Sequence, residues 1–330
     1  MKKIKIGVFL HAEVVSKGWE EVKRLAYESE RLGYDSLWLG DHVAKGTGEY
    51  RLECWTLLSA LATLTKRIRL GPLVLSNQFR HPPVLAKMAA TLDMISGGRL
   101  EFGIGTGWHE GEHLAYGLPF PKPRIRAEIL SEAIEIIKRM WIEEKPSFEG
   151  RHYRIKDALC EPKPLQKPHP PITVGGGGKH LLKVVAKHAD RWDSHGSVDN
   201  YGRKLWVLKE YCSEIGRDFD SIEKSTFSYL VSVYENEEEL LHDMKRLYER
   251  ELKRDVKDIY QKRTVPTTFK NWFKDVRERS LLGTPEQCVT RMQEYIDLGV
   301  SYFMLRFLEP LGKRNGLKIF AQEVMNKVGF

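Results

Sequence analysis

An acid and a histidine, Asp41 and His42, follow a short apolar segment at 36–40 with the sequence SLWLG. A carboxylate and an imidazole side by side can share a proton transfer, because histidine changes its charge near neutral pH. Such a pair can also be structural, but its place directly after a predicted strand favours catalysis. We expect no metal site at this pair, since zinc would require further ligands at fixed spacings around the histidine.

A cluster of glycines lies in the segment LEFGIGTGWHEGE, residues 100–112. Methyltransferases and dinucleotide-binding proteins carry similar clusters, but each needs a strand about 20 residues later that ends in an acid. The segment at 113–130 contains prolines and a predicted helix instead. We therefore expect Gly105, Thr106 and Gly107 to let a flat ligand approach the main chain. The alternative is that these glycines only turn the chain.

A run of four glycines, residues 175–178 in PPITVGGGGKHLL, joins a predicted strand to a predicted helix. Consecutive glycines leave backbone N–H groups accessible, and the N-terminus of a helix favours a bound anion. The run is not a P-loop, because no G-K-[ST] ending follows it. A flexible turn is the alternative, and we expect phosphate binding.

Two further polar side chains, Asn77 and Arg80, follow the apolar segment RIRLGPLVL at 67–75. Either side chain can hydrogen-bond a polar ring or its tail. The alternatives are a helix cap for Asn77 and a surface ion pair for Arg80.

The spacing of apolar segments predicts the scaffold that gathers these residues. Eight short strands are expected, several of them apolar throughout, which is typical of parallel strands buried on both faces. They lie at 5–10, 36–40, 67–75, 99–105, 171–176, 191–196, 227–234 and 302–307. With intervening helices they predict an α/β fold, a (β/α)8 TIM barrel, whose C-terminal strand ends carry the active site. An open doubly wound sheet is the alternative.

We expect a single domain over residues 1–330 with two insertions. The first, at about 108–170, holds a predicted helix, a small hairpin and a proline-rich connector. The second, at about 235–282, is dominated by charged helix. A solvated helix lying on the barrel is the simpler interpretation of the second insertion, and a lid or a subunit contact is the alternative.

The composition, 42% hydrophobic and 30% charged, is that of a packed soluble chain. No apolar segment approaches the ~20 residues of a membrane span, and the N-terminal apolar run is too short for a signal peptide, so we expect a cytoplasmic protein without membrane contact. The four cysteines form no C-x-x-C pair and are expected to be free thiols. The net charge is +8, but the basic residues are scattered, so we expect an anionic small molecule rather than nucleic acid.

Together these stretches resemble the bacterial-luciferase-like family of flavin- and deazaflavin-dependent oxidoreductases. The matching segments are LGYDSLWLGDH at 32–42, the stretch from RIRLGPLVL to GIGTGW at 67–108, EHLAYG at 112–117, PPITVGGGG at 170–178, VAKHADRWD at 185–193 and, more faintly, LGTPEQCVTRMQEYIDLGVSYFML at 282–305. The resemblance implies a TIM barrel that binds a flavin-like ring at the C-terminal ends of its strands.

The resemblance also implies the cofactor. An Asp-His pair after the second strand is typical of family members that use coenzyme F420, an 8-hydroxy-5-deazaflavin, whereas the FMN branch more often has Glu-His there. We therefore expect coenzyme F420, with FMN as the alternative. Because carbon replaces N5 in its ring, a deazaflavin passes a hydride and reacts poorly with oxygen, whereas FMN would allow monooxygenation.

By the same resemblance, Asp41 lies near the ring and His42 is the proton donor or acceptor for the substrate. Leu73–Val74 matches the place of a non-prolyl cis peptide that backs the ring. Thr106 and Gly107 are implied to contact the ring or its side chain, and Gly176, Gly177 and Gly178 the phosphate. His11 and Trp108 are candidate substrate contacts, although His11 can equally be a core histidine.

The expected function is therefore hydride transfer between F420 and a small organic substrate. The alternatives are an FMN-dependent monooxygenase, a non-catalytic flavin-binding barrel and, last, a methyltransferase. Two places depart from sugar-phosphate-oxidising relatives: Trp108 stands where they have Glu, and Lys45 and Gly46 stand where they have Trp. Family members commonly form dimers or tetramers, so a homodimer or homotetramer is expected.

Overall fold

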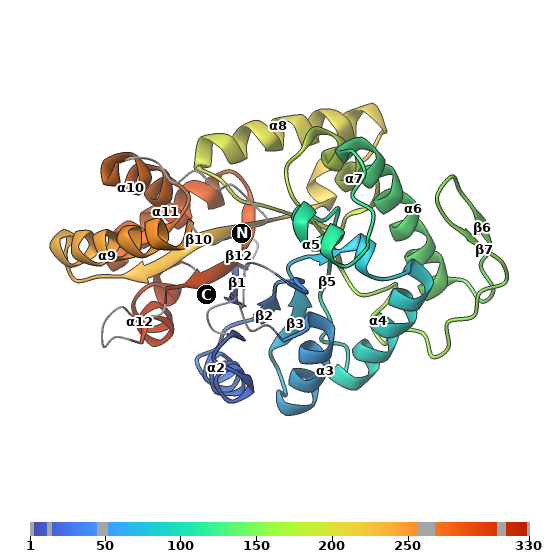
Figure 1. The fold of residues 1–330 in the computed structure, drawn as a ribbon, viewed down its shortest axis with the longest axis horizontal. Coiled ribbons are helices and arrows are strands. Elements are labelled where there is room, and N and C mark those ends of the chain that lie inside the picture. The colour runs from blue at the N-terminus through green and yellow to red at the C-terminus, as the bar shows by residue number, and fades with distance from the viewer. Residues whose placement is uncertain (1–2, 12–14, 45–51, 256–267, 309–314, 329–330) are drawn as a thin grey trace.

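The structure is a computed structural model that describes residues 3–11, 15–44, 52–255, 268–308 and 315–328. Its strands are β1 (Lys5–Leu10), β2 (Ser36–Leu39), β3 (Arg69–Pro72), β4 (Leu75–Ser76), β5 (Phe102–Gly105), β6 (Phe148–Glu149), β7 (Arg154–Ile155), β8 (Ile172–Gly175), β9 (Arg191–Ser194), β10 (Glu223–Val233), β11 (Leu281–Gly283) and β12 (Val300–Phe307). Its α-helices are α2 (Trp19–Arg31), α3 (Cys54–Leu64), α4 (Pro82–Ser96), α5 (Glu110–Ala115), α6 (Pro123–Ile142), α7 (Lys179–His188), α8 (Val198–Glu214), α9 (Glu237–Asp255), α10 (Phe269–Glu278), α11 (Pro285–Asp297) and α12 (Gly316–Glu323). Figure 1 shows most of these helices arranged around the strands.

A parallel sheet closes into a barrel. Its strand order is β3-β2-β1-β12-β10-β9-β8-β5-β4. The ring closes between β3 and the chain just before β5, through a parallel bridge between Leu70 and Leu100. The Leu70 N–H donates to the Arg99 carbonyl at 3.0 Å, and the Glu101 N–H donates to the Leu70 carbonyl at 2.8 Å. The predicted (β/α)8 barrel is therefore confirmed, and the open doubly wound sheet is wrong.

All eight predicted strands are present, and the third is divided into β3 and β4. Leu70 is paired with Leu100 and Leu75 with Ile104. The chain therefore advances by five residues on one side and by four on the other. One extra residue is therefore accommodated around Leu73 and Val74, as in a β-bulge. The short strand β11 was not predicted; it pairs with the far end of β10, off the path of the barrel.

The barrel interior changes from charged to apolar along the strands. At the N-terminal strand ends, the Arg191 guanidinium pairs with Glu101 at 2.6 Å and with Glu223 at 2.7 Å. Nearer the C-terminal ends lies an apolar cluster, called here the apolar floor, made of Trp38, Tyr302 and Met304 with Phe9, Leu73 and Phe227 packed against them. The floor closes the barrel beneath the side on which active sites of this fold are built.

The structure describes a helix and a hairpin inside the first expected insertion and two helices inside the second, of which residues 256–267 lie outside the described residues. In the first, β6 and β7 pair as an antiparallel hairpin, while α6 packs between α4 and α7 in the outer ring. In the second, α9 and α10 pack on the ends of β10 and β11 through a separate apolar cluster that includes Leu240, Met244 and Trp272. The simpler interpretation, a helix lying on the barrel, fits this packing. In the described part of the chain, no helix is long and apolar enough to cross a membrane.

Candidate active site

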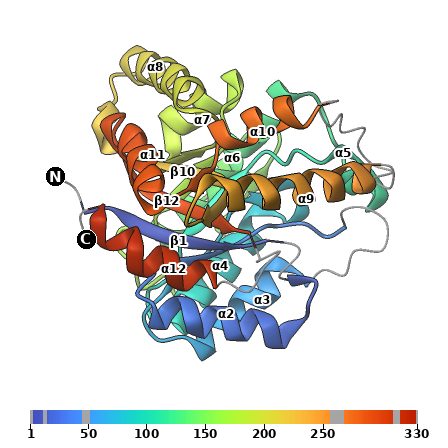
Figure 2. The same cartoon turned by 90° about the vertical axis from the view of Figure 1, so that its left-hand side faces the viewer.

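The candidate residues lie at the ends of four strands. Asp41 and His42 come after β2, Asn77 after β4, Thr106 after β5, and residues 176–178 after β8. The strands of the barrel run parallel, so their C-terminal ends open on the same side, which we call the C-terminal rim. Figure 2 shows the barrel from the side, with α5 past the end of β1. The structure thus brings all four stretches to one rim.

His42 is held by a carboxylate from α5. Nδ1 of His42 lies 2.8 Å from Oε2 of Glu112. The other oxygen of this carboxylate accepts the N–H groups of Val43 and, at 3.0 Å, Ala44. Since an ionised carboxylate only accepts hydrogen bonds, neutral His42 carries its proton on Nδ1. Nε2 is then the nitrogen left to exchange a proton with a bound molecule.

The charge of Glu112 is stabilised by the same contacts. The side chain is buried, and burial favours the neutral acid. The hydrogen bond and charge of His42, with the N–H groups of Ala44 and Val43, outweigh burial and hold the pKa of Glu112 below its ordinary value. Sequence reasoning missed this residue, because 70 positions separate it from His42; its one signal was its place in the EHLAYG match.

Asp41 is engaged in a buried ion pair. Its carboxylate accepts hydrogen bonds from Nη1 of Arg80 at 2.8 Å, from Nη2 of Arg80 at 2.9 Å and from the Ser76 N–H at 2.9 Å. Arg80 also pairs with Glu53, whose carboxylate caps the N-terminus of α3. These contacts tie the loops after β2 and β4 to α3. The ion pair that was an alternative for Arg80 is therefore present, but it is buried and belongs to the rim.

The side chain of Val74 occupies a niche lined by three glycines. The Leu73–Val74 peptide bond is cis, as the resemblance implied. A Cβ on Gly105 would lie 2.8 Å from Cγ2 of Val74, and a Cβ on Gly175 would lie 2.8 Å from Cγ1. A Cβ on Gly103 would lie 3.2 Å from Cγ1. Contacts this short force neighbouring atoms apart, so these glycines make room for Val74 in the barrel wall.

Gly107 is required by a neighbouring hydrogen bond. Its φ is +68°, and a Cβ there would lie 2.6 Å from Oγ of Ser76 and 2.8 Å from Nε2 of His113. Those two atoms are themselves 2.8 Å apart and hydrogen-bonded. Thr106 is half-buried beside them, and its hydroxyl donates to the Gly107 carbonyl at 3.5 Å. Only glycine combines this left-handed backbone with such close packing.

The glycine run after β8 leaves two backbone donors accessible. Both backbone groups of Gly176 are bonded to β9. Within the described residues, the N–H groups of Gly177 and Gly178 donate to no protein acceptor. The side chain of Lys204 packs beside them, since a Cβ on Gly177 would lie 2.6 Å from its Cε. Two free N–H groups at the start of α7, next to an ammonium, fit a phosphate.

Asn77 is buried with part of its hydrogen-bonding capacity unused. Its amide donates to the hydroxyl of Tyr153 at 3.5 Å, so the first insertion reaches the rim. Oδ1 of Asn77 and Nε2 of Gln78 are buried and have no partner in the described part of the chain. Buried polar atoms nearly always have hydrogen-bond partners. These two atoms could therefore bind the polar side chain of a bound molecule.

The two candidate substrate contacts differ in exposure. His11 is buried directly after β1. Trp108 is 53% exposed, and its indole lies edge-on to the imidazole of His42, with ring centroids 5.5 Å apart. Trp108 therefore stands beside the candidate proton-transfer group. Lys45 and Gly46, which depart from sugar-phosphate-oxidising relatives, lie outside the described residues.

The segment HEGEH at 109–113 has the H-E-x-x-H spacing of a zinc motif, although no metal site was expected. The helix α5 begins after His109, whose Nδ1 accepts the Glu112 N–H at 3.1 Å. His113 bonds through Nδ1 to the His109 carbonyl and through Nε2 to Ser76. Across the described ranges, no three His, Cys, Asp or Glu side chains are arranged to hold a metal ion.

Comparison with known proteins places this geometry in a family. Residues 4–302 match the luciferase-like monooxygenase family. The chain belongs to this family. The resemblance expected from the sequence is thereby confirmed, and the methyltransferase alternative is wrong.

Two similar proteins carry the same name, F420-dependent glucose-6-phosphate dehydrogenase. That of Microbacterium testaceum is 28% identical and covers 91% of this chain and 90% of its own length. That of Kineococcus radiotolerans is 32% identical and covers 67% of this chain and 66% of its own length. A solved structure, an F420-dependent secondary alcohol dehydrogenase in complex with an F420–acetone adduct, superposes with a TM-score of 0.80 over 99% of both chains at 18% identity. This likeness supports the fold.

Proposed function

We propose that the protein is an F420-dependent oxidoreductase that transfers a hydride between the deazaflavin and a small organic substrate. The observation that carries this proposal is His42, which Glu112 holds by one nitrogen on the rim where a flavin-like ring is expected. The Asp-His sequence after β2 favours F420 over FMN, and two relatives are named for F420. Bound F420 would supply the ring carbon that gives or takes the hydride.

His42 moves the proton that accompanies the hydride. Because Nδ1 is bound to Glu112, Nε2 takes the proton of a substrate hydroxyl during oxidation and returns it during reduction. The buried carboxylate of Glu112 orients the imidazole and stabilises its charged form. Asp41 takes no part in this transfer, because its oxygens are occupied by Arg80 and Ser76; it positions the loop that carries His42. His11 and Trp108 contact the substrate.

The rim offers the cofactor three kinds of contact. The apolar floor and Val74 provide an apolar surface for a flat ring. The free N–H groups after β8 and the nearby ammonium of Lys204 bind the phosphate, and the orphan oxygen of Asn77 binds the side chain between them. The residues proposed to hold the cofactor are Leu73, Val74, Asn77, Thr106, Gly107, Gly176, Gly177 and Gly178.

Equilibrium binding of both cofactors to the cofactor-free protein tests the proposal. We expect F420 to bind at least about tenfold more tightly than FMN, a difference of about 1.4 kcal/mol. We also expect F420 to be reduced by at least one member of a panel of alcohols. Tighter binding of FMN, with oxygen consumed in turnover, would make the protein a monooxygenase. Tight binding of F420 with no turnover of any alcohol or carbonyl compound would leave a non-catalytic flavin-binding barrel.

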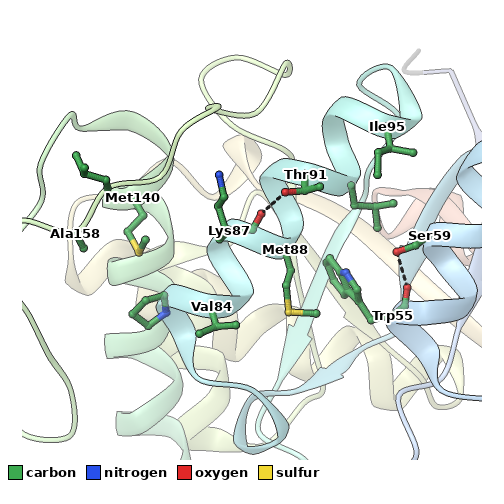
Figure 3. A pocket seen from close by; sticks show the side chains of 12 residues that line it. Trp55, Ser59, Val84, Lys87, Met88, Thr91, Ile95, Met140 and Ala158 are labelled. Carbon is green, nitrogen blue, oxygen red and sulfur yellow. Dashed lines mark hydrogen bonds between the residues drawn. The ribbon is translucent and has the colours of Figure 1, made fainter.

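We further propose a homodimer or homotetramer assembled through the outer face of α3 and α4. A groove of about 570 Å³ lies there between α3, α4 and α6 (Figure 3). Val84 and Ile95 line it and are 56% and 50% exposed, and α3 has no charged residue. In a chain that is 30% charged, such a face fits a subunit contact. Analytical ultracentrifugation should show an oligomer that Ile95→Glu dissociates; a monomeric wild-type protein would contradict this assembly.

A cytoplasmic location and a single domain over residues 1–330 complete the proposal. All four cysteines are free and buried, which fits a reducing compartment.

A further inference from the structure

Arg126, in the first turn of α6, is a buried cation that has no hydrogen-bond or ion-pair partner among the described residues. The residue is 8% exposed. Its Nε and Nη1 are buried and make no hydrogen bond within the described residues. Burial lowers the pKa of Arg126, and the charge of Glu110 opposes this effect without forming an ion pair. A buried guanidinium with unused donors is costly unless something else satisfies it.

The side chain of Arg126 points toward the N-terminus of α6. Side chains of a helix lean in that direction, and the guanidinium carbon lies 3.7 Å from the centroid of the Phe120 ring, which precedes the helix. Stacking on Phe120 uses the face of the guanidinium and leaves the N–H donors at its edge free.

This helix end lacks the groups that normally complete one. The first turn of α6 contains no acidic residue, and the N-cap, Lys122, provides no side-chain hydrogen bond. The other cation of the first turn, Arg124, is already paired with Glu128 at 3.0 Å. Cations at the positive end of a helix dipole are unfavourable unless an anion lies among them. The helix end and the unpartnered arginine therefore indicate the same kind of ligand independently.

A continuous series of contacts connects this helix end to the C-terminal rim. The ring of Phe120 lies 4.9 Å from that of His113, centroid to centroid. Nε2 of His113 is bonded to Oγ of Ser76, which lies against Gly107 on the rim. The cationic helix end is thus packed onto the wall of the candidate active site.

We propose that Arg126 and the N-terminus of α6 form a second anion subsite, which binds a carboxylate or phosphate of a small molecule seated on the rim. The planar fork of arginine matches both groups. Two molecules could supply the anion, and in this respect the subsite rests on the proposed function: the glutamate tail of F420, or an acidic substrate. Its residues differ from those of the phosphate site proposed at Gly177 and Gly178.

Binding constants of two deazaflavins test the subsite with three variants. The ligands are F420 with several glutamates and the deazaflavin riboside that lacks both phosphate and glutamates. Arg126→Met removes the charge but keeps a long apolar side chain, Arg126→Lys keeps the charge, and Arg124→Met is the control on the same helix turn. We expect Arg126→Met to weaken tailed F420 by at least about tenfold and the riboside by less than about twofold. Arg126→Lys should retain part of the affinity, and Arg124→Met should change neither.

The other outcomes are also decisive. If Arg126→Met changes neither deazaflavin but raises the KM of acid-bearing substrates and not of neutral analogues, the substrate supplies the anion and the subsite stands. If neither the affinities nor these KM values change, the subsite is wrong. If the wild-type protein binds no deazaflavin, the proposed function fails, and inorganic phosphate then decides the subsite alone. Phosphate must raise the Tm of the wild-type protein more than that of Arg126→Met.

Discussion

Nδ1 of His42 and Oε2 of Glu112 lie 2.8 Å apart and join the loop after β2 to helix α5. The contact fixes which nitrogen of the imidazole carries the proton, because the carboxylate can only accept. The same carboxylate binds the two N–H groups that follow His42 in the chain. One buried side chain therefore sets both the position and the tautomer of the candidate proton-transfer group.

Replacing either member of this pair should reduce turnover in a graded way. We expect His42→Ala to lower kcat by about 10²- to 10⁴-fold, the usual contribution of general acid–base catalysis. We expect Glu112→Gln to lower kcat by about 10- to 100-fold, since it acts through His42. Neither change should alter the F420 dissociation constant by more than about threefold.

The control for Glu112 is Glu110→Gln on the same helix, which should leave kcat unchanged. Nitrogen NMR of His42 gives a readout that a merely structural role would not move. Nδ1 should carry the proton in the wild-type protein, and Glu112→Gln should lose this preference. Equal kcat values for Glu112→Gln and the wild type would rule out the orienting role.

Asp41 should affect stability more than chemistry. Asp41→Ala leaves Arg80 buried without its main partner, and breaking a buried ion pair costs about 3–5 kcal/mol. Urea denaturation should therefore show a large loss in the free energy of unfolding for Asp41→Ala. As a control, Glu149→Gln, at an exposed ion pair with Arg154, should lose less than about 1 kcal/mol. A loss below about 1 kcal/mol for Asp41→Ala would contradict the structural role.

The close packing of Val74 against glycines predicts that a second substitution can restore part of the stability that a first one removes. Gly175→Ala places a Cβ 2.8 Å from Cγ1 of Val74 and should destabilise the protein by about 1–3 kcal/mol through overpacking. Val74→Ala in the same chain removes the clashing atom and should recover part of this loss. Gly178→Ala is the control, because nothing lies within 4 Å of its added Cβ. Additive effects of the two substitutions in a double-mutant cycle would show that Val74 does not shape the niche.

His188 should make the protein less stable in mild acid. Burial between α6 and α7, with the charges of Lys187 and Lys138, lowers its pKa from 6.5 to about 4. The unfolded chain binds a proton below its own pKa and the folded chain does not, so this stability is complete above about pH 6.5 and is lost as the pH falls toward 4. The loss approaches about 3 kcal/mol over that window.

The variant His188→Gln isolates this effect. It keeps a polar group beside Ser131, whose hydroxyl lies 2.9 Å from Nε2 of His188, and it removes the titration. The free energy of unfolding of the variant should fall less steeply than that of the wild type between about pH 6.5 and 4. Parallel pH curves for the two proteins would exclude His188 as the cause.

The barrel was predictable from the sequence because its strands are buried on both sides. Segments such as KIGVFL and YFMLRF are apolar at successive positions, which only a strand between two covered faces requires. Their spacing then gives the order of the barrel. β11 was missed because Leu281–Gly283 is too short to show any period.

Only those residues of the candidate site whose position follows from the order of the strands were predictable from the sequence. Asp41, His42 and both glycine runs come directly after predicted parallel strands, and this position was enough to predict that they lie on one rim. The partner of His42 was not predictable, because it depends on how α5 folds back across the rim. The glycines beside Val74 were found by their spacing, but their packing role became visible only once three strands lay side by side.

A crystal structure of the protein with bound F420 tests the central claim most directly. The deazaflavin ring should lie on the C-terminal rim against Val74, with Nε2 of His42 facing the substrate side of the ring. The phosphate should accept the N–H groups of Gly177 and Gly178. A ring bound in the outer groove between α3 and α4, or on the rim with His42 turned away from it, would contradict the proposed oxidoreductase.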